Sequence, residues 1–198
     1  MSASVPGVPT RTRILEAAIA CFDRSGFHGA SMGAICAEAG MSPGALYRYF
    51  PSKDAIIAAI VEADRERHAG FFSRLAEADD PVEALATIGI EMMDEMFAEG
   101  GTMLAVEVTA ESRRNEAIRA VVRARADQCR TAISDALTRG QERGLVDPAL
   151  VAGEAAQIIM AIADGLFAQK AQDPTLTADR LRDTLRTLLG RFLRPVGR

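Results

Sequence analysis

The residues whose types and spacing suggest chemistry lie close together near the N-terminus, in the segment SMGAICAEAGMSPGALYRYFPSK, residues 31–53. The end of this segment carries two phenol hydroxyls, on Tyr47 and Tyr49, and an ammonium group on Lys53. Hydroxyl and ammonium groups donate hydrogen bonds to phosphate oxygens, and such contacts fix the register of a protein on a duplex. The segment therefore predicts binding to a nucleic acid. The alternative is that Tyr47 and Phe50 are core residues and that Lys53 is a solvated surface charge.

Two short helices must position these groups. Ser31 and Ser42 are suitable N-cap residues, a proline follows Ser42 at the first helical position, and Gly40 ends the earlier helix. Two short helices joined by a glycine-containing turn form the helix-turn-helix pattern. The second helix begins with small residues, which let its backbone approach the floor of a DNA major groove. We expect base edges to be read by Ser42, Pro43, Gly44, Ala45 and Arg48.

Helical spacing of apolar residues continues along the whole chain, and no segment alternates as a strand would. We therefore expect an all-α fold of about nine helices. The expected helices cover residues 10–24, 32–39, 43–50, 53–77, 80–98, 103–110, 114–139, 147–171 and 177–193. We expect three parts: residues 1–9 as a disordered lead-in, residues 10–55 as a three-helix DNA-binding domain, and residues 56–198 as a second helical domain.

The formal net charge of −4 would, taken alone, argue against a nucleic-acid partner. The charge is uneven, however: residues 1–55 carry five Lys/Arg and four Asp/Glu, whereas residues 56–198 carry 18 and 23. DNA binding needs positive potential only on the contact face. Neither a signal peptide nor an apolar stretch long enough for a bilayer is visible, so we expect a cytoplasmic protein with no membrane partner.

The sequence contains no recognisable catalytic or metal-binding constellation. Cys21, Cys36 and Cys129 match no zinc-site spacing, and we expect all three to be small buried hydrophobic residues. The two histidines, His28 and His68, lie far apart in the sequence, and neither a glycine-rich nucleotide motif nor HExxH is present. We therefore expect a protein that is not an enzyme and has no catalytic residue, no metal site and no cofactor.

Residues 10–56 resemble the N-terminal domain of the tetracycline-repressor (TetR) family. The resemblance rests on the following residues: Phe22, Gly26, Ser31, Ala39-Gly40-Met41-Ser42, Gly44, Leu46-Tyr47-x-Tyr49-Phe50 and Ser52-Lys53-Asp54. It implies that the third helix enters the major groove and that a dimer spans two inverted half-sites of an operator. It also implies DNA contacts by Ser31, Ser42, Pro43, Gly44, Tyr47, Tyr49 and Lys53. The family often has histidine where this chain has Tyr49, and tyrosine keeps the hydrogen bond to phosphate without histidine's protonation near neutral pH.

The resemblance implies a pocket for a small, largely apolar ligand in residues 56–198, whereas the residues taken alone favour ordinary core. The predicted helix over residues 80–98 is apolar over a wide arc, so it must contact other structure, or a cavity, on two sides. Methionine suits a pocket that accepts varied apolar ligands, although it is also a common filler of cores. The candidate lining residues are Met92, Met93, Met96, Phe97, Met103, Leu104 and Phe167. Four acidic residues, Glu91, Asp94, Glu107 and Asp164, would bind a cationic ligand or else be surface charges.

The last two predicted helices are apolar on more than one side, which indicates self-association or a core position. The residues expected at a dimer interface are Ile158, Ile162, Leu181, Leu185, Leu188 and Phe192. The resemblance implies that the two helices pair with their mates in a four-helix bundle across a two-fold axis. We expect a transcriptional regulator, a repressor released from its operator when ligand entry shifts the helices over residues 103–110 and 53–77. The alternatives are control by a protein partner, or activation, with no small-molecule effector.

Overall fold

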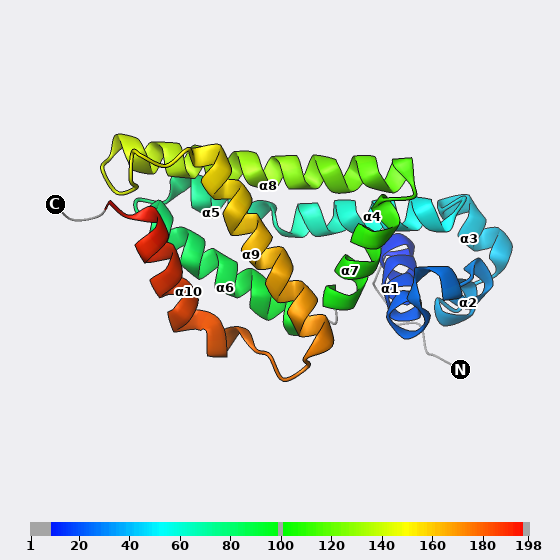
Figure 1. The fold of residues 1–198 in the computed structure, drawn as a ribbon. Coiled ribbons are helices and arrows are strands. Elements are labelled where there is room, and N and C mark those ends of the chain that lie inside the picture. Colours follow the sequence, from blue (N-terminus) through cyan, green and yellow to red (C-terminus); the bar gives the residue numbers. More distant parts are fainter. Residues whose placement is uncertain (1–8, 99–100, 196–198) are drawn as a thin grey trace. The chain divides into compact units, whose positions relative to one another are not determined.

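The computed structural model describes residues 9–98 and 101–195, and every regular element in these ranges is a helix (Figure 1). The helices are α1 (Thr10–Gly29), α2 (Met32–Glu38), α3 (Pro43–Tyr49), α4 (Lys53–Arg67), α5 (Ala69–Glu77), α6 (Pro81–Ala98), α7 (Gly101–Ser112), α8 (Glu116–Glu142), α9 (Ala152–Gln172) and α10 (Ala178–Leu193). The all-α prediction is confirmed. Among the described residues, no helix has the length and apolar character that crossing a bilayer requires.

The three largest differences from the expected helices are at His68, at the end of α1 and at the start of α9. The helix predicted over residues 53–77 is divided at His68, where the N–H of Phe71 bonds to the His68 carbonyl in a tighter turn, at 3.0 Å. Helix α1 runs five residues beyond Arg24, with one break in its helical conformation, at Gly26. Helix α9 begins later than expected because the carboxylate of Asp147 accepts the N–H of Ala149 and stabilises a turn there.

The chain divides into two compact units. The head unit contains α1–α3, α4 as far as Arg65, α7 from Met103, and α8 as far as Arg123. It is larger than the expected DNA-binding domain because α7 and the start of α8 pack with the first helices. The buried core of the head unit includes Ile14, Phe22, Ile35, Leu46, Ile56, Ile57, Leu104, Val108 and Ile118.

Two of the three cysteines belong to the core of the head unit. Cys21 and Cys36 are each 3% exposed, as expected for small hydrophobic residues. Burial raises the pKa of the Cys21 thiol, against the opposing charge of Arg24. Cys129, on α8, is only half-buried.

The described residues of the body unit are 66–98, 101–102 and 124–195. Helix α6 lies against α5, α9 and α10 (Figure 1). Asp80 starts α6 by accepting the N–H groups of Val82 and Glu83, at 3.0 and 3.2 Å, and its second carboxylate oxygen pairs with Arg194 at 2.6 Å. The body unit has two buried clusters, one around Leu85, Leu137 and Leu193 and one around Ile90, Met93 and Leu185.

Candidate nucleic-acid interface

Local capping determines the geometry of the helix-turn-helix. The hydroxyl of Ser31 accepts the N–H of Ala34 at 3.0 Å and so caps α2. Ser42 caps α3 in the same way, accepting the N–H of Ala45 at 3.3 Å. Gly40, between the two helices, has a φ of 63°, a conformation that glycine adopts at little cost. Each serine hydroxyl keeps its own proton while it caps, so it can still donate to a phosphate oxygen.

Helix α3 is anchored by few residues and is otherwise open. Leu46 is fully buried and Phe50, directly after the helix, is 5% exposed. Tyr47 and Tyr49 are 52% and 48% exposed. The alternative in which Tyr47 is a core residue is therefore wrong, whereas Phe50 is indeed core. The remaining residues expected to read bases are exposed, apart from the half-buried Ala45: Ser42, Pro43, Gly44 and Arg48.

Lys53, at the start of α4, has a structural role in the head unit. Its ammonium donates to the carbonyl oxygens of Phe27 and Ala30, at 2.6 and 2.7 Å. The ammonium also lies 4.5 Å from the centre of the Phe27 ring, a cation–π contact. Two of its three N–H groups are used in this way, which leaves one for a phosphate. Lys53 is therefore not the freely solvated charge of the alternative interpretation.

The residues expected to line an apolar pocket do not form one group. Met93 is 5% exposed and packs in the second body cluster, which also includes Phe97 and Phe167, with their ring centres 6.2 Å apart. Met92 packs against the first body cluster, and Met96 is half-buried. Leu104 belongs to the core of the head unit, and the side chain of Met103 lies outside the described residues.

Three of the four acidic candidates have protein partners. Glu91 bonds to Arg74 at 2.5 Å, and this hydrogen bond holds the pKa of the Glu91 carboxyl below its usual value. Asp94 pairs with an arginine of α10 at 3.6 Å. Glu107 bonds to the backbone of the head unit. Asp164 differs, because desolvation raises the pKa of its carboxyl despite the opposing charge of Arg125.

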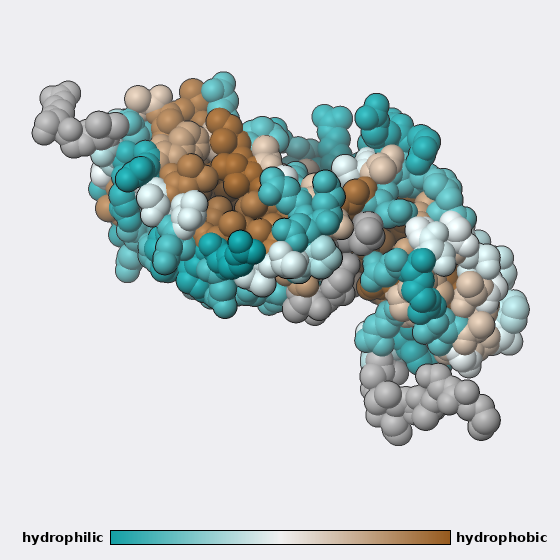
Figure 2. All heavy atoms as spheres, turned by 60° about the horizontal axis from the view of Figure 1, so that its bottom comes forward, coloured by the Kyte–Doolittle hydropathy of each residue, from teal (hydrophilic) through white to brown (hydrophobic). Residues whose placement is uncertain are grey.

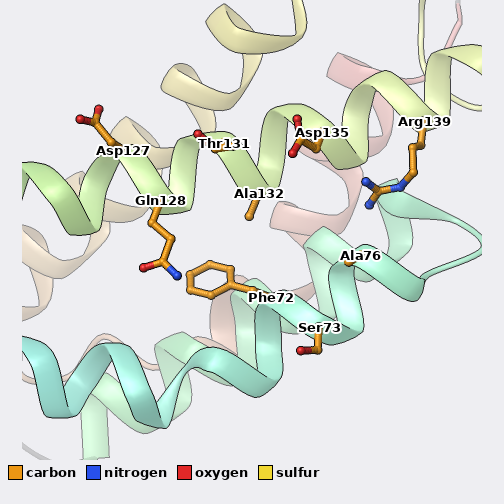
Figure 3. Close-up of a pocket in the computed structure, with 9 residues that line it drawn as sticks. All are labelled: Phe72, Ser73, Ala76, Asp127, Gln128, Thr131, Ala132, Asp135 and Arg139. Atoms are coloured by element: carbon orange, nitrogen blue, oxygen red, sulfur yellow. The ribbon is translucent and has the colours of Figure 1, made fainter.

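A groove of about 590 Å³ lies between α5 and α8 in the body unit (Figure 3). The groove is lined in part by small residues, including Ala76 and Ala132, whose short side chains do not fill it. Gln128 and Phe72 point toward one another (Figure 3). Polar groups at its edges come from Ser73, Asp127, Thr131, Asp135 and Arg139. The sequence interpretation did not include this groove, because alanines on helices look like ordinary helix-forming residues.

The predicted dimer residues include exposed and packed side chains. Ile158 on α9 is 48% exposed and Leu188 on α10 is 43% exposed. Leu185 is buried, and three others pack partly buried against the body clusters: Ile162, Leu181 and Phe192. Apolar side chains gather on one face of the body unit (Figure 2).

Comparison with known proteins defines the class of protein. A family model described as bacterial regulatory proteins of the tetR family matches residues 14–60, and one described as the C-terminal part of BetI-type transcriptional repressors matches residues 81–194. The HTH-type transcriptional regulator UidR of Escherichia coli K12 is 31% identical over 185 residues, which are 93% of each chain. The class is therefore the helix-turn-helix transcriptional regulators.

Solved structures agree with this class. Salmonella enterica GusR has a TM-score of 0.78 and 32% identity, over 96% of this chain and 97% of its own. A transcriptional regulator from Saccharomonospora viridis, solved in complex with choline, has a TM-score of 0.81 over 94% and 98% of the two chains. At 24% identity the latter shows a shared fold. The chain belongs to the tetR family, whose members regulate transcription and are not enzymes.

Proposed function

We propose that the protein is a homodimeric repressor that binds an operator of inverted half-sites and leaves it when a small, largely apolar molecule binds. The observation that carries the DNA-binding part is the exposure of Tyr47 and Tyr49 on a helix held by Leu46. Half-exposed tyrosines on a short helix contribute little to the core. They are well suited to donate hydroxyls to phosphates on either side of a groove.

The proposed contacts fall into two groups. The hydroxyls of Ser31, Tyr47 and Tyr49 and the third N–H of Lys53 bind phosphates and fix the register. The bases are read by Ser42, Pro43, Gly44, Ala45 and Arg48. An arginine can bind the two acceptors of guanine, and the apolar residues can contact a thymine methyl group.

The proposed effector binds in the body unit. Two structures of similar fold support the proposal that the effector is a small molecule. The Saccharomonospora viridis regulator was solved with choline, and FadR from Bacillus subtilis with stearoyl-CoA. In this chain the candidate places are the groove between α5 and α8 and the apolar cluster that holds Phe97 and Phe167. Ala132 lines the groove and is not part of the apolar cluster, so a bulky substitution there would affect an effector in the groove only.

The proposed dimer uses the apolar side chains of α9 and α10. Ile158 and Leu188 are exposed in the single chain, where each leaves apolar surface in water. Burying such surface against a second copy would stabilise the pair, and two-fold symmetry matches inverted half-sites.

The experiment that tests this function starts with random-sequence duplex DNA. We expect the protein to select duplexes with inverted half-sites and to bind them more weakly as salt rises. Compounds from a metabolite and drug panel that release the selected duplex identify the effector class. If no compound does so while a protein partner does, the regulator has no small-molecule effector. Raised expression of a reporter placed behind the selected duplex would indicate activation.

A further inference from the structure

Helix α7 contacts the last turn of α1, which lies just before α2, the first helix of the helix-turn-helix. Gly26 has φ 68° and ψ 168°, so it interrupts the helical conformation of α1. The next residue, Phe27, begins a new turn, in which the N–H of Ala30 bonds to the Gly26 carbonyl at 3.1 Å. The first N–H groups of a helical turn have no regular partner within it. Phe27 is 5% exposed, and its ring packs on that of Phe22, with ring centres 5.6 Å apart. The turn is thus anchored in the core, but its backbone needs partners from elsewhere.

Glu107 of α7 supplies the missing acceptor. Its Oε2 accepts the N–H of Phe27 at 2.6 Å, across 80 residues of sequence. The carboxylate lies directly over Gly26, since a Cβ there would be 3.1 Å from Oε1 of Glu107. A hydrogen bond to an ionised acceptor is stronger than one between neutral groups. One turn further along α7, Glu111 is 2.9 Å from the exposed ring of His28.

Lys53 binds the same turn from α4. It bonds the carbonyl of Phe27 and the carbonyl of Ala30, which directly precedes the N-cap of α2. The turn is therefore held by a carboxylate of α7 and by an ammonium at the start of α4. All these residues belong to the head unit. Phe27 therefore receives a contact from α7 at its N–H and one from α4 at its carbonyl.

We propose that Glu107 is a positioning residue for DNA binding: by holding the backbone N–H of Phe27 it keeps α2 and α3 in the arrangement that fits the operator. The inference rests on the proposed function and extends it to a particular contact. A displacement of α7 on effector binding would break this contact and lower DNA affinity. Glu107 thus acts on the helix-turn-helix through the backbone of Phe27.

Substitution of Glu107 tests the proposal, because the loss of its charge should raise DNA affinity whereas the loss of its hydrogen bond to Phe27 should lower it. Removing any carboxylate makes the protein less negative and by itself favours DNA binding. We expect Glu107→Ala nevertheless to weaken binding about tenfold, since the bond to Phe27 is lost. Glu107→Gln keeps a carbonyl acceptor and should bind as the wild type or more tightly. Glu116→Ala, on an 83% exposed residue paired with Arg119, is the control for the loss of charge and should not weaken binding.

The binding assay is fluorescence anisotropy, over a salt series, with a duplex that the wild type selects from random sequences. The slope of affinity with salt should be the same in all variants, because the phosphate contacts are unchanged. Wild-type affinity of Glu107→Ala, or a loss in Glu107→Gln as large as in Glu107→Ala, would overturn the proposal. If the wild type itself selects no sequence, the proposed function fails instead.

Hydrogen exchange of the Phe27 amide gives a test that needs no variant. We expect this N–H to exchange slowly in the wild type, and more slowly still when the selected duplex is bound, because the coupling of the two contacts is reciprocal. Rapid exchange of the Phe27 amide in the free and bound wild type would contradict the proposal, even if Glu107→Ala cannot be purified in a folded form.

Discussion

Glu107 and Lys53 bind the two backbone groups of one residue: the carboxylate accepts the N–H of Phe27 at 2.6 Å and the ammonium donates to its carbonyl, also at 2.6 Å. Substitutions of Lys53 therefore change the head unit as well as any phosphate contact. A loss of DNA binding in a Lys53 variant does not by itself identify a phosphate ligand. The two exposed tyrosines of α3 give a cleaner test.

We expect Tyr47→Phe and Tyr49→Phe each to weaken operator binding about tenfold. A hydrogen bond to a charged group contributes about 1.5 kcal/mol or more, and phenylalanine removes only the hydroxyl. Both rings are about half exposed, so the free energy of unfolding should not change. Anisotropy titrations against several operator variants measure the effect. Losses that depend on the base sequence would contradict a phosphate role.

The helix-turn-helix could be predicted from sequence because its signals are local. Ser31 and Ser42 cap their helices within three residues, and Gly40 supplies the left-handed turn between them. The burial of Leu46 and Phe50 follows from the apolar pattern of the same short segment. Each of these features depends on neighbours in the chain, so the sequence carries the signal.

The contact of Glu107 with Phe27 could not be predicted in this way. It joins groups 80 residues apart, and one of the groups is a backbone N–H, which has no sequence signature. The interpretation of Glu107 as a ligand contact or a surface charge missed it for this reason. The groove between α5 and α8 was missed because Ala76 and Ala132 mark a space only when two helices face each other.

Ala132→Trp should block the groove and leave operator binding unchanged. If the effector binds there, the concentration of a panel compound that releases half of the operator should rise about tenfold or more, since the added ring fills the site. Thr138→Trp, at an exposed position six residues further along α8, is the matched control. A response that Phe167→Ala abolishes and Ala132→Trp does not would place the effector in the apolar cluster.

Charges at the exposed apolar positions of α9 and α10 should break the proposed dimer. We expect the double variant Ile158→Glu/Leu188→Glu to raise the dimer dissociation constant about a hundredfold, because each carboxylate would be buried without a partner at the interface. Sedimentation velocity over a range of concentrations measures this constant. Val106→Glu, on a residue 39% exposed in the head unit, controls for the loss of an exposed apolar side chain. A wild type that sediments as a monomer, or a double variant that remains dimeric, would contradict the interface.

Asp80 should make the free energy of unfolding of the body unit decrease at acidic pH. Desolvation tends to raise the pKa of its carboxyl, but the hydrogen bond from Arg194 and the N–H groups of Glu83 and Val82 outweigh it and hold the pKa below the usual 3.8. A carboxyl whose pKa is lower in the folded than in the unfolded state stabilises the fold at pH values above its unfolded pKa. This stabilisation is lost as the pH falls through the folded-state pKa.

Asp80→Asn keeps an acceptor for the helix cap but loses the ion pair with Arg194. We expect it to be less stable than the wild type at pH 7, with the difference shrinking below about pH 4. Urea titrations between pH 7 and pH 3 measure this. Asp79→Asn, on a fully exposed neighbour that pairs with Arg143 at 3.2 Å, should match the wild type throughout. A constant difference between Asp80→Asn and the wild type at every pH would exclude the ion pair as its cause.

Gly140→Ala should destabilise the body unit, although alanine favours helices. A Cβ at Gly140 would lie 2.5 Å from Cγ2 of Val146 and 2.7 Å from Cγ of Pro81, and both of these residues are buried. Overpacking of this kind costs about 1–3 kcal/mol, which exceeds the gain of about 1 kcal/mol in helix propensity. Gly89→Ala in α6 is the control, because its Cβ would meet nothing within 4 Å and should stabilise the fold by about 0.5–1 kcal/mol. Urea unfolding of the two variants measures the contrast, and equal stability would mean that the end of α8 does not approach Pro81 so closely.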